Sequence, residues 1–271
     1  METGGYEVGK LLGETDFADL YRCTLPDKTL GVLKIAKELS DNGRLDREAF
    51  VVRLLKEAAE CLEEEFAKTK PNKDEFLGYG LFFPNPVESF VAEDEGGKRI
   101  NIVNFLAVPE DLGRLVPLAH FVDRAQERID QKTSAWICGK LLKALAFAHN
   151  QGISVGQIDG ENILIEKNKH HVLIFDWSNA ISHPSGTVPQ SVAREEISQV
   201  AKVVILALGG NTETGELPPD ELVTEKDYQE FLFSLASGNE DNALQANEKF
   251  YRLIRSLWPR EFHPFTVYGL D

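Results

Sequence analysis

The fold of this chain is decided by the stretch 153–178, ISVGQIDGENILIEKNKHHVLIFDWS. Two short apolar runs, at 163–165 and 172–175, lie on either side of a polar, charged tip at 167–171. Apolar runs of this length around a turn are typical of the two strands of a β-hairpin. The sequence therefore predicts a hairpin here, with polar residues at the open end of its strands.

The open end of this hairpin is a candidate metal site. If the tip is centred on Lys169, then Asn162 and Asp176 are equally far from it, one on each strand. Directly opposed residues on paired strands lie about 5 Å apart. An amide oxygen and a carboxylate at that distance suit a hard cation such as Mg²⁺, which prefers oxygen ligands. Asn162 and Asp176 are therefore the predicted metal ligands.

The same stretch resembles the catalytic loop and the metal-binding strand of eukaryotic-type protein kinases, whose pattern is H-R-D-L-x-x-x-N followed by D-F-G. With Asn162 on the motif asparagine, Gln157 takes the place of the catalytic aspartate. The D-F-G triplet reads Asp176, Trp177, Ser178. The resemblance implies that ATP and Mg²⁺ are the ligands. It also implies a missing base, because Gln157 cannot hold a proton near neutral pH.

A nearby carboxylate, Asp159, is the candidate substitute for the missing base. It occupies the position at which protein kinases place a lysine that contacts the transferred phosphate. A carboxylate there would repel the phosphate unless a cation intervened. Asp159 would reach the acceptor only in a rearranged loop, or it would serve as a third metal ligand. Because a general base contributes roughly 10²–10⁴-fold, we expect crippled phosphoryl transfer.

The N-terminal stretch at 6–23 resembles the phosphate-covering loop of the same family, G-x-G-x-x-G-x-V. Only the first glycine is retained, as Gly13, and Leu20 takes the place of the valine. Thr15 and Ala18 replace the other two glycines. Since glycines let the backbone approach phosphates closely, we expect a weakened grip on a triphosphate.

Lys34 lies within the apolar run GVLKIA at 31–36. Neither face of such a strand is polar, so the lysine needs a counter-charge or an anionic ligand. The resemblance implies both, a helix glutamate and the nucleotide phosphates. Glu48, near the start of a helix predicted at 46–68, is the expected partner, and Glu57 is the reserve. The alternative is an edge-strand lysine that extends to water.

Two further strands are predicted at 87–93 and 99–106, where β-branched and aromatic residues are frequent. The segment that follows them resembles the connector between the two lobes of a kinase, which binds adenine through backbone groups. The resemblance implies nucleotide contacts at Val103, Asn104, Leu106 and, on the hairpin, Leu164.

Helical spacing of apolar residues predicts later helices at 132–150, 196–208, about 225–237 and 241–257. Together with the strands before residue 106, these helices predict an α+β fold. The resemblance implies one two-lobed, protein-kinase-like domain, with a small antiparallel β lobe at 1–106 and a larger, mainly helical lobe at 107–271. The segment that follows Asp176 is short and has no A-P-E motif, so we do not expect peptide recognition of the usual kinase type.

The composition of the 271 residues, 42% hydrophobic and 27% charged, is ordinary for a globular protein. No apolar run approaches the roughly 18 residues of a membrane span, and the N-terminus lacks the apolar core of a signal peptide. Three distant cysteines predict neither a disulfide framework nor a zinc site. We expect a cytoplasmic protein that binds no membrane. The net charge of −15 argues against nucleic acid, which requires a basic face.

Three functions remain open. The first is a pseudokinase, a regulatory or scaffolding module that binds ATP and Mg²⁺ weakly and contacts an unidentified protein partner. The second is an atypical ATP-dependent phosphotransferase of low activity, acting on a protein or a small molecule with Asp159 as its base. The third is an interaction domain that binds no nucleotide. The missing base, the altered glycine loop and the missing A-P-E motif favour the first.

Overall fold

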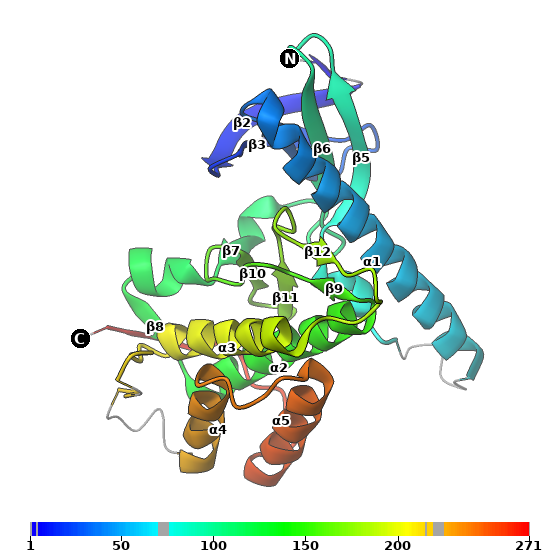
Figure 1. Cartoon of the computed structure of the whole chain (residues 1–271). Coiled ribbons are helices and arrows are strands. Elements are labelled where there is room, and N and C mark those ends of the chain that lie inside the picture. The colour runs from blue at the N-terminus through cyan, green and yellow to red at the C-terminus, as the bar shows by residue number, and fades with distance from the viewer. Residues whose placement is uncertain (1, 4, 70–75, 215, 219–224, 271) are drawn as a thin grey trace. The chain divides into compact units, whose positions relative to one another are not determined.

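A computed structural model describes residues 2–3, 5–69, 76–214, 216–218 and 225–270 (Figure 1). The chain is an α+β protein with two compact units. The first unit comprises Met1–Leu115 and Phe175–Ala180, and the second comprises Val116–Ile174 and Ile181–Asp271. The lobes that we expected at 1–106 and 107–271 stay a prediction. Among the described residues, no helix combines the length and the apolar character needed to cross a membrane.

The first unit is built on an antiparallel sheet of six strands in the order β1-β2-β3-β4-β6-β5. The two strands predicted near 87–93 and 99–106 are confirmed, each displaced by one or two residues. The strands are β1 (Glu2–Thr3), β2 (Tyr6–Glu14), β3 (Ala18–Thr24), β4 (Leu30–Ala36), β5 (Asn85–Ala92) and β6 (Lys98–Asn104).

The two faces of this sheet pack differently. One face carries an apolar cluster that includes Cys23, Leu33, Ile100 and Ile102. Helix α1 (Asn42–Thr69) packs against β4, β5 and β6, as Figure 1 shows for the blue and cyan segments. Because side chains alternate along a strand, neighbours of Leu33 on β4 face this helix. The helix predicted at 46–68 is therefore confirmed, and it begins four residues earlier.

The second unit is mainly helical. Helix α2 packs against α3 and α5, and α4 packs against both α3 and α5. The predicted helices at 132–150, 225–237 and 241–257 are confirmed to within two residues. Helix α3 begins six residues before the predicted start at 196, directly after Pro189. The helices are α2 (Gln131–Asn150), α3 (Gln190–Ala207), α4 (Lys226–Ala236) and α5 (Ala243–Leu257).

Three small sheets complete the second unit, and most of their strands are too short to show a sequence period. They run in the orders β11-β10-β7, β12-β9 and β13-β8. The predicted hairpin at 163–175 is confirmed as β10 (Ile163–Glu166) and β11 (His171–Ile174). The remaining strands are β7 (Leu115–Pro117), β8 (Glu127–Ile129), β9 (Ile153–Ser154), β12 (Ile181–Ser182) and β13 (Val267–Gly269). Short helical turns occur at Leu39–Asp41, Tyr79–Phe82, Leu112–Arg114 and His120–Arg124.

The contact between α2 and α5 depends on a glycine in the middle of α2. A Cβ atom at Gly139 would lie 2.6 Å from Cε1 of Phe250, whose ring is buried on α5. Such a separation is well below van der Waals contact. A glycine in a helix interior costs about 1 kcal/mol relative to alanine, so close packing explains its presence here.

We predict that Gly139→Ala lowers the free energy of unfolding by about 1–2 kcal/mol, since overpacking outweighs the gain in helix propensity. The measurement is urea denaturation followed by circular dichroism. Gly43→Ala on α1 is the matched control, because a Cβ there meets nothing within 4 Å. Phe250→Leu should cost less in the Gly139→Ala background than in the natural chain. An increase in stability with Gly139→Ala would contradict this packing.

Candidate functional site

Lys34 of β4 and Glu48 of α1 form a buried ion pair, and each side chain is 3% exposed. The expected pairing of Lys34 with Glu48 is thereby confirmed. Glu57, the reserve partner, is exposed farther along the same helix. Two charges taken out of water require good geometry and further hydrogen bonds to offset the loss of hydration. The surroundings of this pair supply those hydrogen bonds.

Asn101 holds Glu48 from the neighbouring strand. It lies opposite Lys34 in the pairing of β4 with β6. Its Nδ2 donates to Glu48 Oε2 at 3.2 Å and to the carbonyl of Leu45 at 2.7 Å, and its Oδ1 accepts from Ser89 Oγ at 2.7 Å. Burial raises the pKa of the Glu48 carboxyl, and the Lys34 ammonium acts in the opposite direction. Asn101 was not among the residues that the sequence singled out.

The segment Phe175–Ala180 belongs to the first unit because β4 and α1 bind it. Lys34 Nζ lies 3.9 Å from the centre of the Phe175 ring and donates to the Phe175 carbonyl at 3.5 Å. The backbone N–H of Trp177 approaches Glu48 Oε1 at 3.4 Å, and Arg47 donates to the Ser178 carbonyl at 3.2 Å. An ammonium over a ring face is attracted by the ring's quadrupole. The chain's own groups therefore surround the Lys34 cation.

The loop that carries Gln157 closes on itself. Gln157 Nε2 donates to Asp159 Oδ2 at 2.7 Å. Asp159 Oδ1 accepts from the backbone N–H groups of Glu161 and Asn162 at 3.0 and 2.9 Å. Asn162 Nδ2 donates in turn to the Gln157 carbonyl at 3.0 Å. Asp159 thus serves as the hydrogen-bond acceptor that shapes this loop. Aspartate commonly takes this role in turns, because its short side chain reaches the backbone N–H groups that follow it.

Helix α3 fixes the backbone on both sides of Gln157. Glu196 Oε1 accepts from the Gly156 N–H at 2.6 Å, and Gln199 Oε1 accepts from the Ile158 N–H at 2.9 Å. The second oxygen of Glu196 is 2.7 Å from His149 Nε2 at the end of α2. Glu196 is buried, so these partners compensate for the loss of water around its carboxylate. The sequence signal for this role is a glutamate on an otherwise apolar helix face.

The hairpin register differs by one residue from the prediction. Ile163 pairs with Ile174 and Glu166 pairs with His171, so the turn is centred between residues 168 and 169 rather than on Lys169. The reason is the loop at 167–170, which has an even number of residues and therefore no central one. Asn162 and Asp176 are consequently not equally far from the tip, and the expectation of direct opposition is wrong.

The two predicted metal ligands belong to different units, Asn162 to the second and Asp176 to the first. Asp176 Oδ1 accepts from the Ser178 N–H at 2.9 Å, which turns the backbone sharply after β11. In the described part of the chain, no cluster of three or more histidine, cysteine, aspartate or glutamate side chains forms a metal site by itself. A magnesium site shared by Asn162 and Asp176 stays a prediction.

The turn at 15–18, within the stretch that resembles a glycine loop, is closed by hydrogen bonds. Thr15 and Ala18 exchange backbone and side-chain hydrogen bonds of 2.8–3.2 Å, and the Phe17 side chain between them is buried in the unit. Gly13 pairs with Leu20 across β2 and β3. A Cβ at Gly13 would meet nothing within 4 Å, so the strand itself does not require a glycine there.

The remaining predicted nucleotide contacts are distributed over both units. Val103 and Asn104 end β6 beside β4, and Leu106 follows with 56% of its surface exposed. Leu164 lies on β10 in the second unit. Their roles in nucleotide binding stay predictions.

No family model matches the chain, and no curated protein matches it.

We predict that Lys34→Met lowers the free energy of unfolding by about 3–5 kcal/mol, because it leaves the Glu48 carboxylate buried without its cation. The double variant Lys34→Met/Glu48→Gln should lose less than the sum of the two single variants, as urea denaturation would measure. Lys37→Met is the matched control: its ion pair with Glu14 is partly exposed and should contribute less than about 1 kcal/mol. Equal losses for Lys34→Met and Lys37→Met would refute the buried pair.

Proposed function

We propose that this chain is a pseudokinase, a two-lobed, protein-kinase-like module that regulates or scaffolds other proteins and transfers phosphate poorly or not at all. The observation that carries the proposal is the hydrogen bond between Gln157 and Asp159. At the position of the missing base stands a carboxamide, and its NH₂ group donates to the neighbouring carboxylate. Phosphoryl transfer needs a group that orients the acceptor hydroxyl, and this loop offers an amide instead.

The contacts of Asp159 argue against its use as a substitute base. One of its oxygens binds the Gln157 amide, and the other binds two backbone N–H groups. Moving this carboxylate toward an acceptor would break three hydrogen bonds, each contributing about 0.5–1.5 kcal/mol. The loop would also lose the contacts that define its turn. An atypical phosphotransferase based on Asp159 is therefore the less favoured alternative.

ATP and Mg²⁺ are proposed as weak ligands. Lys34, Glu48, Asn162 and Asp176 are the residues that would serve them, because Mg²⁺ commonly takes one or two protein carboxylate or amide oxygens together with phosphate oxygens and water. A phosphate would have to compete with the Phe175 carbonyl and ring for the Lys34 ammonium. The turn at Thr15–Ala18 supplies no glycine for close backbone approach. Both features lower the affinity that we expect for ATP.

The second candidate function is an interaction domain that binds no nucleotide. The specific observation in its favour is the environment of Lys34, whose buried ammonium has a carboxylate, a carbonyl oxygen and an aromatic ring around it. An ammonium has three N–H donors. Because groups of the chain already lie next to the Lys34 ammonium, a nucleotide phosphate would have to displace one of them. Nucleotide binding separates this candidate from the first.

We predict phosphoryl transfer at least about 10²-fold slower than in typical kinases, which turn over at roughly 1–100 s⁻¹. The assay is transfer from radiolabelled ATP to water, to the chain itself and to a basic protein mixture. Gln157→Asp should raise any residual rate by about 10²-fold, whereas Asp159→Asn should leave it unchanged. Gln190→Asp, at an exposed glutamine, is the control. Kinase-like turnover that Asp159→Asn abolishes would favour the phosphotransferase.

We predict that 10 mM ATP with Mg²⁺ raises the melting temperature by about 2–4 °C, as expected for millimolar affinity, because a ligand selective for the folded state stabilises it. Asp176→Asn should reduce the shift by removing a predicted metal ligand. Asp94→Asn, at an exposed turn, should not. The absence of a shift in the natural chain would select the nucleotide-free interaction domain.

A further inference from the structure

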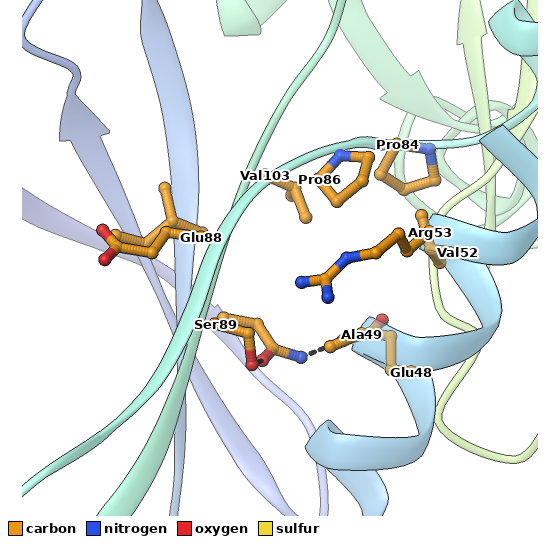
Figure 2. Close-up of a pocket in the computed structure, with 11 residues that line it drawn as sticks. Glu48, Ala49, Val52, Arg53, Pro84, Pro86, Glu88, Ser89 and Val103 are labelled. Atoms are coloured by element: carbon orange, nitrogen blue, oxygen red, sulfur yellow. Dashed lines mark hydrogen bonds between the residues drawn. The ribbon is translucent and has the colours of Figure 1, made fainter. Parts of the chain in front are cut away.

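A shallow hollow borders Glu48 in the first unit, between α1 and the strands β5 and β6 (Figure 2). Val52, Arg53 and Pro86 are among the residues that line it. The room inside it suffices for about one water molecule, so the hollow is not a ligand site. The second unit instead carries a cluster of aromatic and titratable side chains that none of the predicted sites uses.

The segment 258–270, which follows α5, forms a strap on the second unit. Its strand β13 pairs with β8. The N–H of Leu270 donates to the carbonyl of Gln126 at 2.8 Å, and the N–H of Thr266 donates to Thr133 Oγ1 at 3.1 Å. None of the residues of the strap is fully buried. A segment with so few buried contacts opens at a lower free energy than the core of its unit.

One imidazole joins the strap to the tip of the β10–β11 hairpin. The ring of His170 stacks on Trp136 of α2, with centroids 4.5 Å apart and planes 4° apart. It also stacks on Phe262 of the strap, with centroids 4.6 Å apart and planes 12° apart. Phe262 is 74% exposed, so few other groups cover its ring. The imidazole thus lies between a ring of the helix and a ring of the strap.

A lysine of the same hairpin tip makes a second contact with the strap. The Nζ atom of Lys167 lies 4.7 Å from the centre of the Phe121 ring and 5.2 Å from that of Phe265 in the strap. The rings of Phe121 and Phe265 also contact each other, with centroids 5.0 Å apart. Cation–π attraction therefore supports the strap beside the imidazole stack.

The surroundings of His170 disfavour a charged imidazole. Burial lowers its pKa, His263 of the strap and Lys140 of α2 act in the same direction, and Glu166 of β10 opposes them. Among the described residues, the buried Nε2 atom of His170 has no hydrogen-bond partner. An imidazolium would place an N–H donor there without an acceptor. The faces of the two stacked rings attract a cation by less than such a buried donor costs.

The sign of the pH response follows from the lowered pKa. The detached strap leaves His170 in water, where it binds a proton more readily than in the stack. The stack therefore contributes fully above about pH 6.5, the ordinary pKa of histidine, and its contribution is lost as the pH falls. His263 acts in the opposite sense, because its Nε2 lies 2.7 Å from Asp130 Oδ2 and protonation would create an ion pair. The two histidines must be tested separately.

We propose that the segment 258–270 is a pH-responsive strap, which an uncharged His170 imidazole holds on the hairpin tip and which proton uptake by that ring releases. Release would separate Phe262 from His170 and Phe265 from Phe121. The inference does not rest on the proposed function, because none of these residues belongs to the loop of Gln157 or to the predicted nucleotide contacts.

The test is hydrogen exchange of the full chain followed by mass spectrometry, with labelling times adjusted for the intrinsic pH dependence of exchange. The readout is the protection of the amides at 266–270, with those of α3 as the internal reference for global unfolding. We expect protection at about pH 5.5 to be at least about threefold lower than at about pH 7.5. His263→Gln should enlarge this difference by removing the opposing ion pair.

Two variants of His170 separate the charge from the ring. His170→Phe keeps an aromatic ring that takes up no proton, so the difference between the two pH values should disappear. His170→Asn removes the stack and suits the left-handed backbone at this position, where φ is 54°. It should lower protection about equally at both pH values. Because each variant is compared with itself, a uniform loss of stability does not affect the result.

His183→Gln is the matched control. His183 lies in the same unit, but its Nε2 is 3.0 Å from Ser154 Oγ and not beside the strap. This variant should keep the pH difference of the natural chain. Protection at 266–270 that stays constant or rises on acidification, in both the natural chain and His263→Gln, would overturn the proposal. The same pH difference in His170→Phe as in the natural chain would also overturn it.

Discussion

The need to compensate two buried charges organises the first unit. An ammonium on β4 and a carboxylate on α1 are both out of water, and each would be costly without the other. The pair therefore holds the helix against the sheet at one point along its length. Asn101 adds a hydrogen bond to the same carboxylate from the adjacent strand. The segment Phe175–Ala180 joins this unit through contacts with the same two charged residues.

A second buried carboxylate plays a similar part in the other unit. Glu196 accepts a hydrogen bond from a backbone N–H of the loop that precedes the hairpin, and its other oxygen contacts the imidazole of His149 at the end of α2. The loop is thus fixed to two helices, while Asp159 shapes its interior. Both carboxylates serve as hydrogen-bond acceptors for the chain itself. This use of acidic groups fixes the backbone of the loop at 156–162.

Part of this structure could be predicted from the sequence, and the physical reasons differ by element. Long helices such as α2 carry several turns of apolar spacing, so their existence and their bounds were predictable. A charge in an apolar strand indicated that Lys34 needs a counter-charge, and the kinase resemblance supplied the choice of the helix glutamate Glu48. Strands of two or three residues, such as β9 and β13, carry too little pattern to be found. The start of α3 was missed because four of its first six residues, QSVARE, are polar and show no apolar period.

Other features depended on backbone details that no pattern encodes. The hairpin register differed by one residue because the turn at 167–170 has an even length. The contact between Gln157 and Asp159 joins residues two apart in a loop, where geometry depends on the local backbone. Asn101 was missed because an asparagine in a strand is unremarkable in sequence. Its hydrogen-bond partners became visible only in the fold.

The central claim is that the carboxamide of Gln157 holds Asp159, so that no base faces an acceptor. A crystal structure of the chain with a non-hydrolysable ATP analogue and Mg²⁺ tests it most directly. The account predicts that the hydrogen bond between Gln157 Nε2 and Asp159 Oδ2 persists in that complex, or in crystals that bind no nucleotide. An Asp159 carboxylate turned away from Gln157 and directed at the terminal phosphate would contradict it.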